Sequence, residues 1–222
     1  MVEASLAREG GGYGDLIVRL AASEGTAGHS YARGGTLRAG RFATRNLADA
    51  IHYLCALHAR YPGVIDLAAG RTATPGVGPF LIRAVDGFAI ERNYLTKLVV
   101  AAGPQPSTPG QAECEAAVVG QRHALEMLAQ SDREGCAAGA AIALVLDWRA
   151  IREALDIAAA RMSVNVPECK LPDADECADT TALIATGPAI ERAMGFGAQQ
   201  LLGQHRGLWD LLDARQIARG EY

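Results

Sequence analysis

Acidic and histidine side chains stand on otherwise apolar helix faces, and these residues are the ones able to do chemistry. Glu91 interrupts an apolar stripe with positions three and four residues apart: Val77, Leu81, Ala84, Phe88, Leu95, Leu98 and Ala102. A carboxylate buried there must be paired, protonated or metal-bound, because desolvating an isolated charge is too costly. One interpretation is an ion pair with an arginine of another helix, and the other is a functional ligand. We expect Glu91 to be buried and to face His123 or Asp147.

Three further helices carry residues of the same types. His58 shares a face with leucine and isoleucine side chains and is expected to point into the core. His123 and Glu126 are one helical turn apart, so that a local pair is the alternative to metal ligation. Asp147 follows an apolar run and is expected at the core boundary, with Arg92 or Arg122 as its ion-pair partner.

A metal site inside a helical bundle is one chemical hypothesis. Its predicted ligands come from four helices and suit iron or manganese: Glu91, His123, Glu126, Asp147 and His58. Ferritin-like di-metal sites need Glu-x-x-His on two helices, and the nearest match is Asp49-x-x-His52. His123-x-x-Glu126 has the reverse order, so a metal-free relative of such a bundle fits equally well. Haem with His58 or His123 as axial ligand is a further alternative that no motif selects.

The composition favours one helical domain, residues 1–222. Half of the residues are hydrophobic, aromatic residues are only 5%, and alanine is abundant, which favours helices over strands. The net charge of −4 comes without a basic stripe, which argues against nucleic-acid binding. No catalytic signature such as GxSxG, a P-loop or HExxH is present.

The sequence also predicts a cytoplasmic protein that does not enter a membrane. The longest apolar run, Cys136 to Leu146, is too short to span a bilayer and is expected to be a buried helix segment. The N-terminal residues lack a signal-peptide pattern. The five cysteines form no CxxC pair, as is typical of reduced thiols in a cytosol.

Capping residues, prolines and glycines divide the chain into expected elements. We predict helices over residues 15–22, 44–61, from 74–79 to 103, 108–129, 132–162, and from 181 or 188 to about 219. The last of these is expected to break near its glycines at 195–207. Residues 1–13 are expected to be flexible, 25–40 irregular, and 163–180 an acidic surface loop. Short connections predict an all-α, antiparallel multi-helix bundle of ferritin-like or haem-oxygenase-like architecture.

Residues 103–148 resemble an uncharacterised alphaproteobacterial helical protein family. The stretches that carry the resemblance are GPQPSTPGQAECEA, GQRHALEMLAQSDREGCAAGAA and LVLDW. The resemblance implies a bacterial cytosolic protein and supplies no mechanism. The leading functional prediction is therefore non-catalytic binding of a small ligand or a protein partner, and the alternative is a metal-dependent oxidoreductase.

Overall fold

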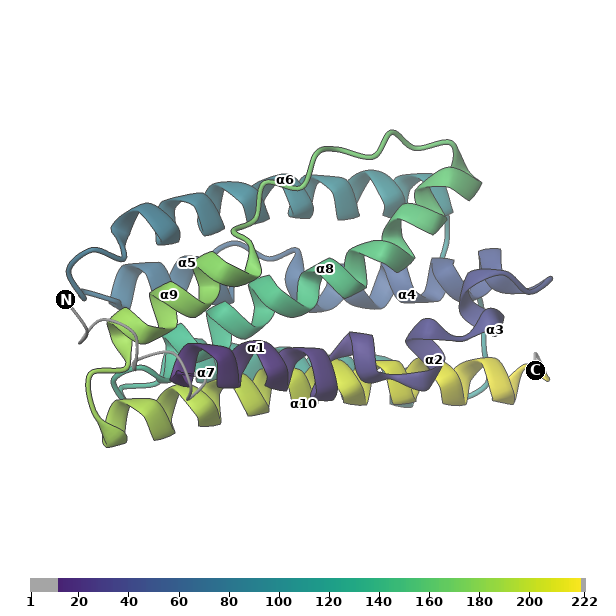
Figure 1. Cartoon of the computed structure of the whole chain (residues 1–222). Coiled ribbons are helices and arrows are strands. Elements are labelled where there is room, and N and C mark those ends of the chain that lie inside the picture. Colours follow the sequence, from purple (N-terminus) through teal and green to yellow (C-terminus); the bar gives the residue numbers. More distant parts are fainter. Residues whose placement is uncertain (1–11, 221–222) are drawn as a thin grey trace, which may run out of the picture.

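The computed structural model describes residues 12–220, and within them every regular element is a helix. The first part of the chain forms α1 (Tyr13–Glu24), a 3-10 helix (Thr26–Gly28), α2 (Ser30–Arg33), α3 (Gly35–Arg38), α4 (Ala43–His58) and α5 (Val64–Arg71). The remainder forms α6 (Gly78–Ala102), α7 (Gln111–Ala129), α8 (Cys136–Met162), α9 (Ala174–Ile184) and α10 (Pro188–Ala218). The all-α prediction is confirmed, and Figure 1 shows the long helices lying side by side as a bundle.

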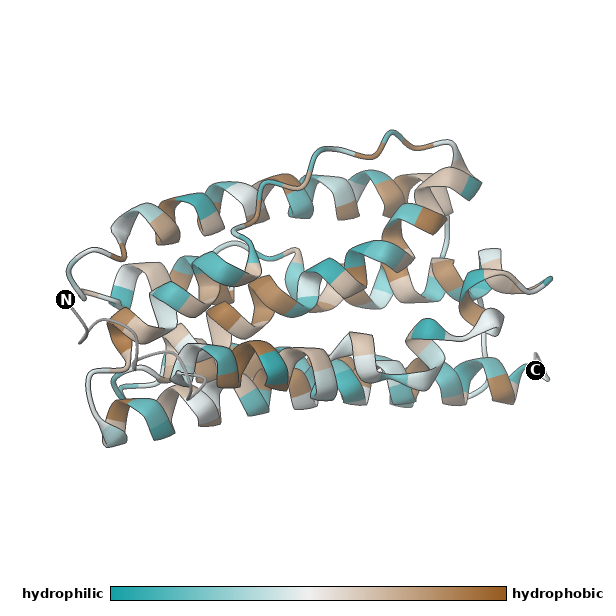
Figure 2. Ribbon diagram, viewed as in Figure 1, coloured by the Kyte–Doolittle hydropathy of each residue, from teal (hydrophilic) through white to brown (hydrophobic). Residues whose placement is uncertain are grey.

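Helix α8 is the central helix of this bundle. Its apolar run Cys136 to Leu146 is buried except for the half-exposed Leu146, as the sequence predicted. Two fully buried tryptophans, Trp148 on α8 and Trp209 on α10, extend the same core. Residues of opposite hydropathy alternate along each long helix, which is the pattern of helices with one buried face (Figure 2).

Helices α8 and α10 approach each other through glycines. A Cβ atom on Gly139 would lie 2.1 Å from the carbonyl oxygen of Met194, and one on Gly197 would lie 2.1 Å from that of Cys136. Both glycines therefore permit backbone contact that no larger residue allows. The predicted break near residues 195–207 is wrong, because α10 is continuous from Pro188 to Ala218. Packing against α8 outweighs the low helix propensity of its glycines.

The predicted acidic loop over residues 163–180 is wrong in its second half. Helix α9 begins inside it, with Asp173 as N-cap. The Asp173 carboxylate accepts a hydrogen bond from the Glu176 amide at 2.9 Å, and the Glu176 carboxylate accepts one from the Asp173 amide at 3.0 Å. This reciprocal capping box, together with the fully buried Cys177, orders a segment whose charge suggested a loop.

Other boundaries differ from expectation by smaller amounts. Residues 25–40, expected to be irregular, form short helical turns, and Val64–Arg71 forms the separate helix α5. Helices α7 and α8 begin later than predicted, after Gly110 and Gly135, which adopt φ of 74° and 87°. Of the segment predicted to be flexible, residues 1–11 lie outside the described residues, whereas Tyr13 begins α1. None of the described helices combines the length and the apolar character needed to cross a membrane.

Candidate functional site

Two histidines and an aspartate form a continuous buried chain across the bundle core. The Nε2 atoms of His58 on α4 and His205 on α10 are 2.9 Å apart. The Nδ1 atom of His205 lies 2.6 Å from the Oδ2 atom of Asp147 on α8. All three side chains are buried, with 4% exposure or less. The prediction of His58 as a core residue is thus confirmed, Asp147 lies deeper than the core boundary at which it was expected, and His205 joins them.

With Asp147 ionised and His205 neutral, one order of donors and acceptors satisfies every contact in this chain. Ionised Asp147 is a pure acceptor, so His205 donates its Nδ1–H to the carboxylate. Neutral His205 then offers a lone pair at Nε2, and His58 must donate its own Nε2–H to it. The Nδ1 atom of His58 is left as the proton acceptor at the end of the chain. The arrangement can therefore accept a proton at His58 without rearranging side chains.

Asp147 is held on its other side by the turn that follows α1. The Thr26 amide donates to Oδ1 at 2.6 Å, and the Thr26 hydroxyl donates to Oδ2 at 2.8 Å. The Trp209 indole donates to that same hydroxyl at 2.9 Å. A Cβ atom at Gly25 would lie 2.2 Å from the carboxylate, so glycine is needed for this approach. The predicted arginine partner of Asp147 is wrong, since hydrogen bonds from neutral groups and an imidazole satisfy it instead.

Two aromatic rings pack against the buried His58 ring. The His58 ring lies 5.4 Å from the Trp148 ring and 6.3 Å from the Phe88 ring, both edge to face. Burial, and secondarily the neighbouring His205 ring, lower the pKa of His58 well below its ordinary value of 6.5. A cavity of about 30 Å³ borders His58, which is room for one water molecule.

Glu91 belongs to a second buried group, on the other side of these rings. Its Oε1 atom accepts from Arg152 at 2.6 Å, and its Oε2 atom accepts from the Trp148 indole at 3.0 Å. Burial raises the pKa of Glu91, although Trp148 and Arg152 oppose that shift. The predicted burial is confirmed, as is an arginine partner from another helix. The prediction that Glu91 faces His123 or Asp147 is wrong.

The remaining two predicted ligands lie at the surface of α7. The His123 side chain is 72% exposed, and its Nδ1 atom is 4.0 Å from Glu126. Glu126 also lies 3.7 Å from Arg60 and 3.6 Å from Arg122. The local His123–Glu126 pair is therefore present. Within residues 12–220, no three His, Cys, Asp or Glu side chains are grouped so that they could hold a metal ion.

A cleft of about 590 Å³ opens at one end of the bundle, where three interhelical loops meet. Two arginines and four hydroxyl residues line it: Arg71, Arg133, Thr72, Thr74, Ser131 and Thr186. The first turn of α8 also faces it, with Ala137 and Ala138 in the lining. That turn contains no acidic residue, and its N-cap Gly135 supplies no side-chain hydrogen bond. The partial positive charge at this helix end is thus without a side-chain cap.

Comparison with known proteins places the chain in a family. Residues 21–220 match the family of unknown function DUF6975. The chain belongs to this family. No curated protein and no solved structure matches it. The DUF6975 match covers nearly all the described residues, so that both the buried histidine chain and the end cleft lie within the family region.

Sequence reasoning missed His205, the residue that links the two predicted core groups in this DUF6975 member. The signal was present, because His205 lies in phase with Leu201, Leu208, Trp209 and Leu212 along one face of α10. The glycines nearby suggested a break there, and a broken helix has no continuous face. Histidine on an apolar helix face was the informative pattern, as it was for His58.

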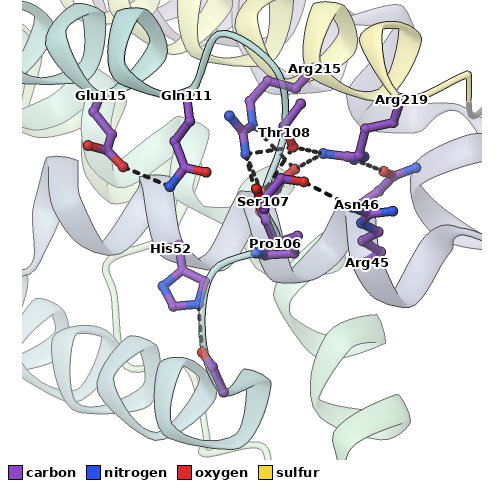
Figure 3. Close-up of polar contacts among 12 residues, drawn as sticks. Arg45, Asn46, His52, Pro106, Ser107, Thr108, Gln111, Glu115, Arg215 and Arg219 are labelled. Atoms are coloured by element: carbon purple, nitrogen blue, oxygen red, sulfur yellow. Dashed lines mark hydrogen bonds and ion pairs between the residues drawn. The ribbon is translucent and has the colours of Figure 1, made fainter.

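A third buried charged group was also missed, where α10 ends against α4 (Figure 3). Asp49 accepts from Arg215 at 3.0 Å and also pairs with Arg219, and all three side chains are nearly fully buried. Arg215 and Arg219 further donate to the Thr108 hydroxyl, which ties the α6–α7 connection to α10. His52 contacts the Gly103 carbonyl oxygen at 2.9 Å instead. The Asp49-x-x-His52 spacing therefore serves two separate structural contacts in this chain.

Proposed function

We propose that this DUF6975 protein is a non-catalytic binding protein for a small ligand that carries a carboxylate or phosphate group. The single observation that supports the proposal is the uncapped first turn of α8 at the floor of the 590 Å³ cleft. Free backbone amides at a helix N-terminus bind anionic groups through hydrogen bonds and the helix dipole. The volume falls in the range of sites for small molecules.

The side chains around the cleft suit a ligand with both an anionic group and further polar groups. Arg71 and Arg133 supply guanidinium donors, and Arg71 lies 3.2 Å from Asp132 at the rim. Because Asp132 and Glu134 balance the two arginines, the helix terminus supplies the uncompensated positive potential. Hydroxyl groups of Thr72, Thr74 and Ser131 can donate to or accept from the ligand.

Inorganic phosphate is the simplest probe of this proposal. We expect phosphate to raise the melting temperature of the wild-type protein in a concentration-dependent manner, with chloride at equal ionic strength as the reference. The double variant Arg71→Gln and Arg133→Gln should lose most of this increase. The matched control is Arg83→Gln, because Arg83 pairs with Glu176 outside the cleft. No phosphate effect, or an equal effect in the double variant, would contradict the proposal.

A second candidate function is metal-dependent oxidation and reduction at His58 and His205, and a specific observation favours it. Histidine ligands of metals usually donate their second ring nitrogen to a carboxylate, as His205 does to Asp147. The facing Nε2 atoms would supply two nitrogen ligands for iron or manganese, with further ligands needed from water or substrate.

Elemental analysis of protein purified without added metal tests this candidate. Near-stoichiometric iron or manganese that is lost in His205→Gln would support it, with His123→Gln as the control on an exposed histidine. A folded, metal-free protein that takes up neither iron nor manganese on titration would contradict this candidate function.

A further inference from the structure

Three buried polar atoms without hydrogen-bond partners lie together near the end of α10. They are the Tyr53 hydroxyl oxygen, the Gln105 side-chain nitrogen and the Nη1 atom of Arg215, and none of them meets a partner among residues 12–220. The Arg215 guanidinium lies 5.0 Å from the centre of the Tyr53 ring, and the Gln105 amide adjoins the Tyr53 hydroxyl. Tyr53 and Arg215 are each only 2% exposed. Because burial without a partner is costly, an acceptor placed among these atoms would be strongly favoured.

All three groups are hydrogen-bond donors, and one of them is charged. Arg215 uses Nε and Nη2 to bind Asp49, so that Nη1 is the nitrogen left over. Its Nη2 atom also donates to the Pro106 carbonyl oxygen at 3.2 Å (Figure 3). Burial raises the pKa of Tyr53 above its ordinary value of 10.0, so that the hydroxyl stays protonated and able to donate. The partner that suits these donors is a small, negatively charged oxygen atom.

The Cys114 thiol lies beside these donors. Cys114 is a free, half-buried cysteine of α7, and its side chain packs against the edge of the core. The Arg215 guanidinium adjoins the thiol, and the Tyr53 hydroxyl lies close enough to be influenced by its charge. A small reagent can reach the sulfur from solvent, because part of the cysteine is exposed. An oxygen atom attached to this sulfur would enter the group of donors.

We propose that Cys114 is a site of oxidation to a sulfenate by a hydroperoxide, and that the three donors bind the oxygen atom that it acquires. The thiolate sulfur attacks the terminal oxygen of the hydroperoxide, so that an S–O bond forms and the O–O bond breaks. Sulfur loses two electrons, which leave with the second peroxide oxygen. That oxygen takes the hydroperoxide proton and departs as water or an alcohol. The sulfenate oxygen then accepts hydrogen bonds that the reduced protein leaves unmade.

The other four cysteines provide internal comparisons. Cys136 and Cys177 are buried, and burial raises the pKa of Cys177 to about 12. Burial also raises the pKa of the half-buried Cys55. Since the thiolate is the form that reacts, these shifts slow the oxidation of Cys177 and Cys55. Cys169 is half-buried like Cys114 and is therefore the closest comparison.

Trapping of sulfenates with dimedone during exposure to hydrogen peroxide tests the proposal. Mass spectrometry of the cysteine-containing peptides gives the labelling rate of each thiol. We expect Cys114 to be labelled at least about tenfold faster than Cys169, because charge-assisted hydrogen bonds stabilise its oxidised form. No label on Cys114, or equal labelling of Cys114 and Cys169, would overturn the proposal and would leave the donors as a site for bound water.

Tyr53→Phe separates the proposed role from a structural one. It removes a donor that makes no hydrogen bond in the reduced protein, so that the urea midpoint should not fall below wild type. The oxidation rate of Cys114 should nevertheless fall about threefold to tenfold, as expected for one lost hydrogen bond. The matched control is Tyr61→Phe, on a tyrosine that is 77% exposed, and it should change neither quantity. Oxidation of Cys114 at the wild-type rate in Tyr53→Phe would overturn the proposal.

Gln105→Leu provides a second variant that removes another of the three donors. It should slow the oxidation of Cys114 by a similar factor, again without loss of a hydrogen bond present in the reduced protein. The outcome does not depend on phosphate binding in the cleft. The cleft is lined by Thr186, which precedes α10, whereas Arg215 lies in the last turn of that helix.

Discussion

The two buried carboxylates on either side of the Trp148 ring are satisfied in different ways. Glu91 is paired with Arg152, whose guanidinium stays protonated at any physiological pH. Asp147 is paired with His205, and the chain continues to His58, so that its partners can change protonation state. The neighbouring α8 residues Asp147 and Trp148 thus contact different groups. Asp147 contacts a titratable imidazole, and Trp148 contacts the carboxylate that is paired with the permanent cation Arg152. This difference marks the histidine chain as the one of these two groups that responds to protons near neutral pH.

The largest effect on the free energy of unfolding is expected when Arg152, the permanent cation, is replaced. Arg152→Met should lower the free energy of unfolding by about 3–5 kcal/mol, because Glu91 is left buried without its charged partner. The double variant with Glu91→Leu should recover most of this loss, since a well-packed apolar pair needs no compensation. Urea unfolding of both variants measures the difference. A single variant as stable as wild type would contradict the assignment.

Replacing His205, the titratable partner of Asp147, should lower the free energy of unfolding by less. His205→Phe keeps an aromatic ring at this position but takes away the hydrogen bonds to Asp147 and to His58, and we expect a loss of about 2–3 kcal/mol. The loss is smaller than for Arg152→Met because Thr26 still donates twice to Asp147. The same urea titration gives the comparison. If His205→Phe proved the more damaging variant, the order of the two groups would be reversed.

Acidification should destabilise the protein through His58. Burial lowers the pKa of His58 in the folded state, so that below about pH 6.5 the unfolded chain binds the extra proton. Stability should therefore fall as the pH is lowered from about 6.5 towards the depressed folded value, by at most about 1.4 kcal/mol per pH unit for this group. Unfolding free energies measured across this range should show a shallower slope in His58→Gln. An unchanged slope would assign the effect to other groups.

Glu91 should give the free energy of unfolding a pH dependence of opposite sign to that from His58. Its pKa in the folded state is raised above the ordinary value of 4.5, so that the folded state holds the proton more tightly there. Its contribution to stability is present below about pH 4.5 and is lost as the pH rises through the folded value. Glu91→Gln should remove this decline. Stability curves of Glu91→Gln and His58→Gln should therefore depart from wild type with opposite signs.

The smallest effects are expected at the surface pair. His123→Ala and Glu126→Ala should each change the free energy of unfolding by no more than about 0.5 kcal/mol, because the His123–Glu126 contact is long and solvated. Urea unfolding checks this, under the conditions used for the buried groups. A loss comparable to that of His205→Phe would show that these residues support the core.

Periodicity predicted the helices well because an apolar stripe reports directly on burial. It placed Glu91 and His58 in the interior and Asp147 at the core boundary, and all three are buried. It could not supply their partners, since these depend on how helices rotate and cross. Arg152, for example, reaches Glu91 across a gap of 61 residues in sequence. His123 lies on an apolar stripe too, but that stripe faces outwards.

Charge and glycine were the misleading signals. Acidic residues suggested a loop at residues 173–180, where two of them instead cap a helix. Glycines suggested a break in α10, where they allow contact with α8. At Asp173 the missed signal was itself local, a capping box with Glu176, whereas in α10 the contact of Gly197 with α8 lay outside the reach of local reasoning.

The glycine contact between α8 and α10 also sets the alignment of the histidine chain. His205 lies eight residues beyond Gly197 in one unbroken helix, a separation of about 12 Å. Because α10 is one unbroken helix, its contact with α8 at Gly197 fixes the position along the helix axis at which the His205 imidazole meets Asp147 of α8. A shift of α10 by one helical turn would move the His205 ring about 5.4 Å away from Asp147. The close contacts at Gly139 and Gly197 therefore help to set the register of the buried histidine chain, although both glycines lie outside it.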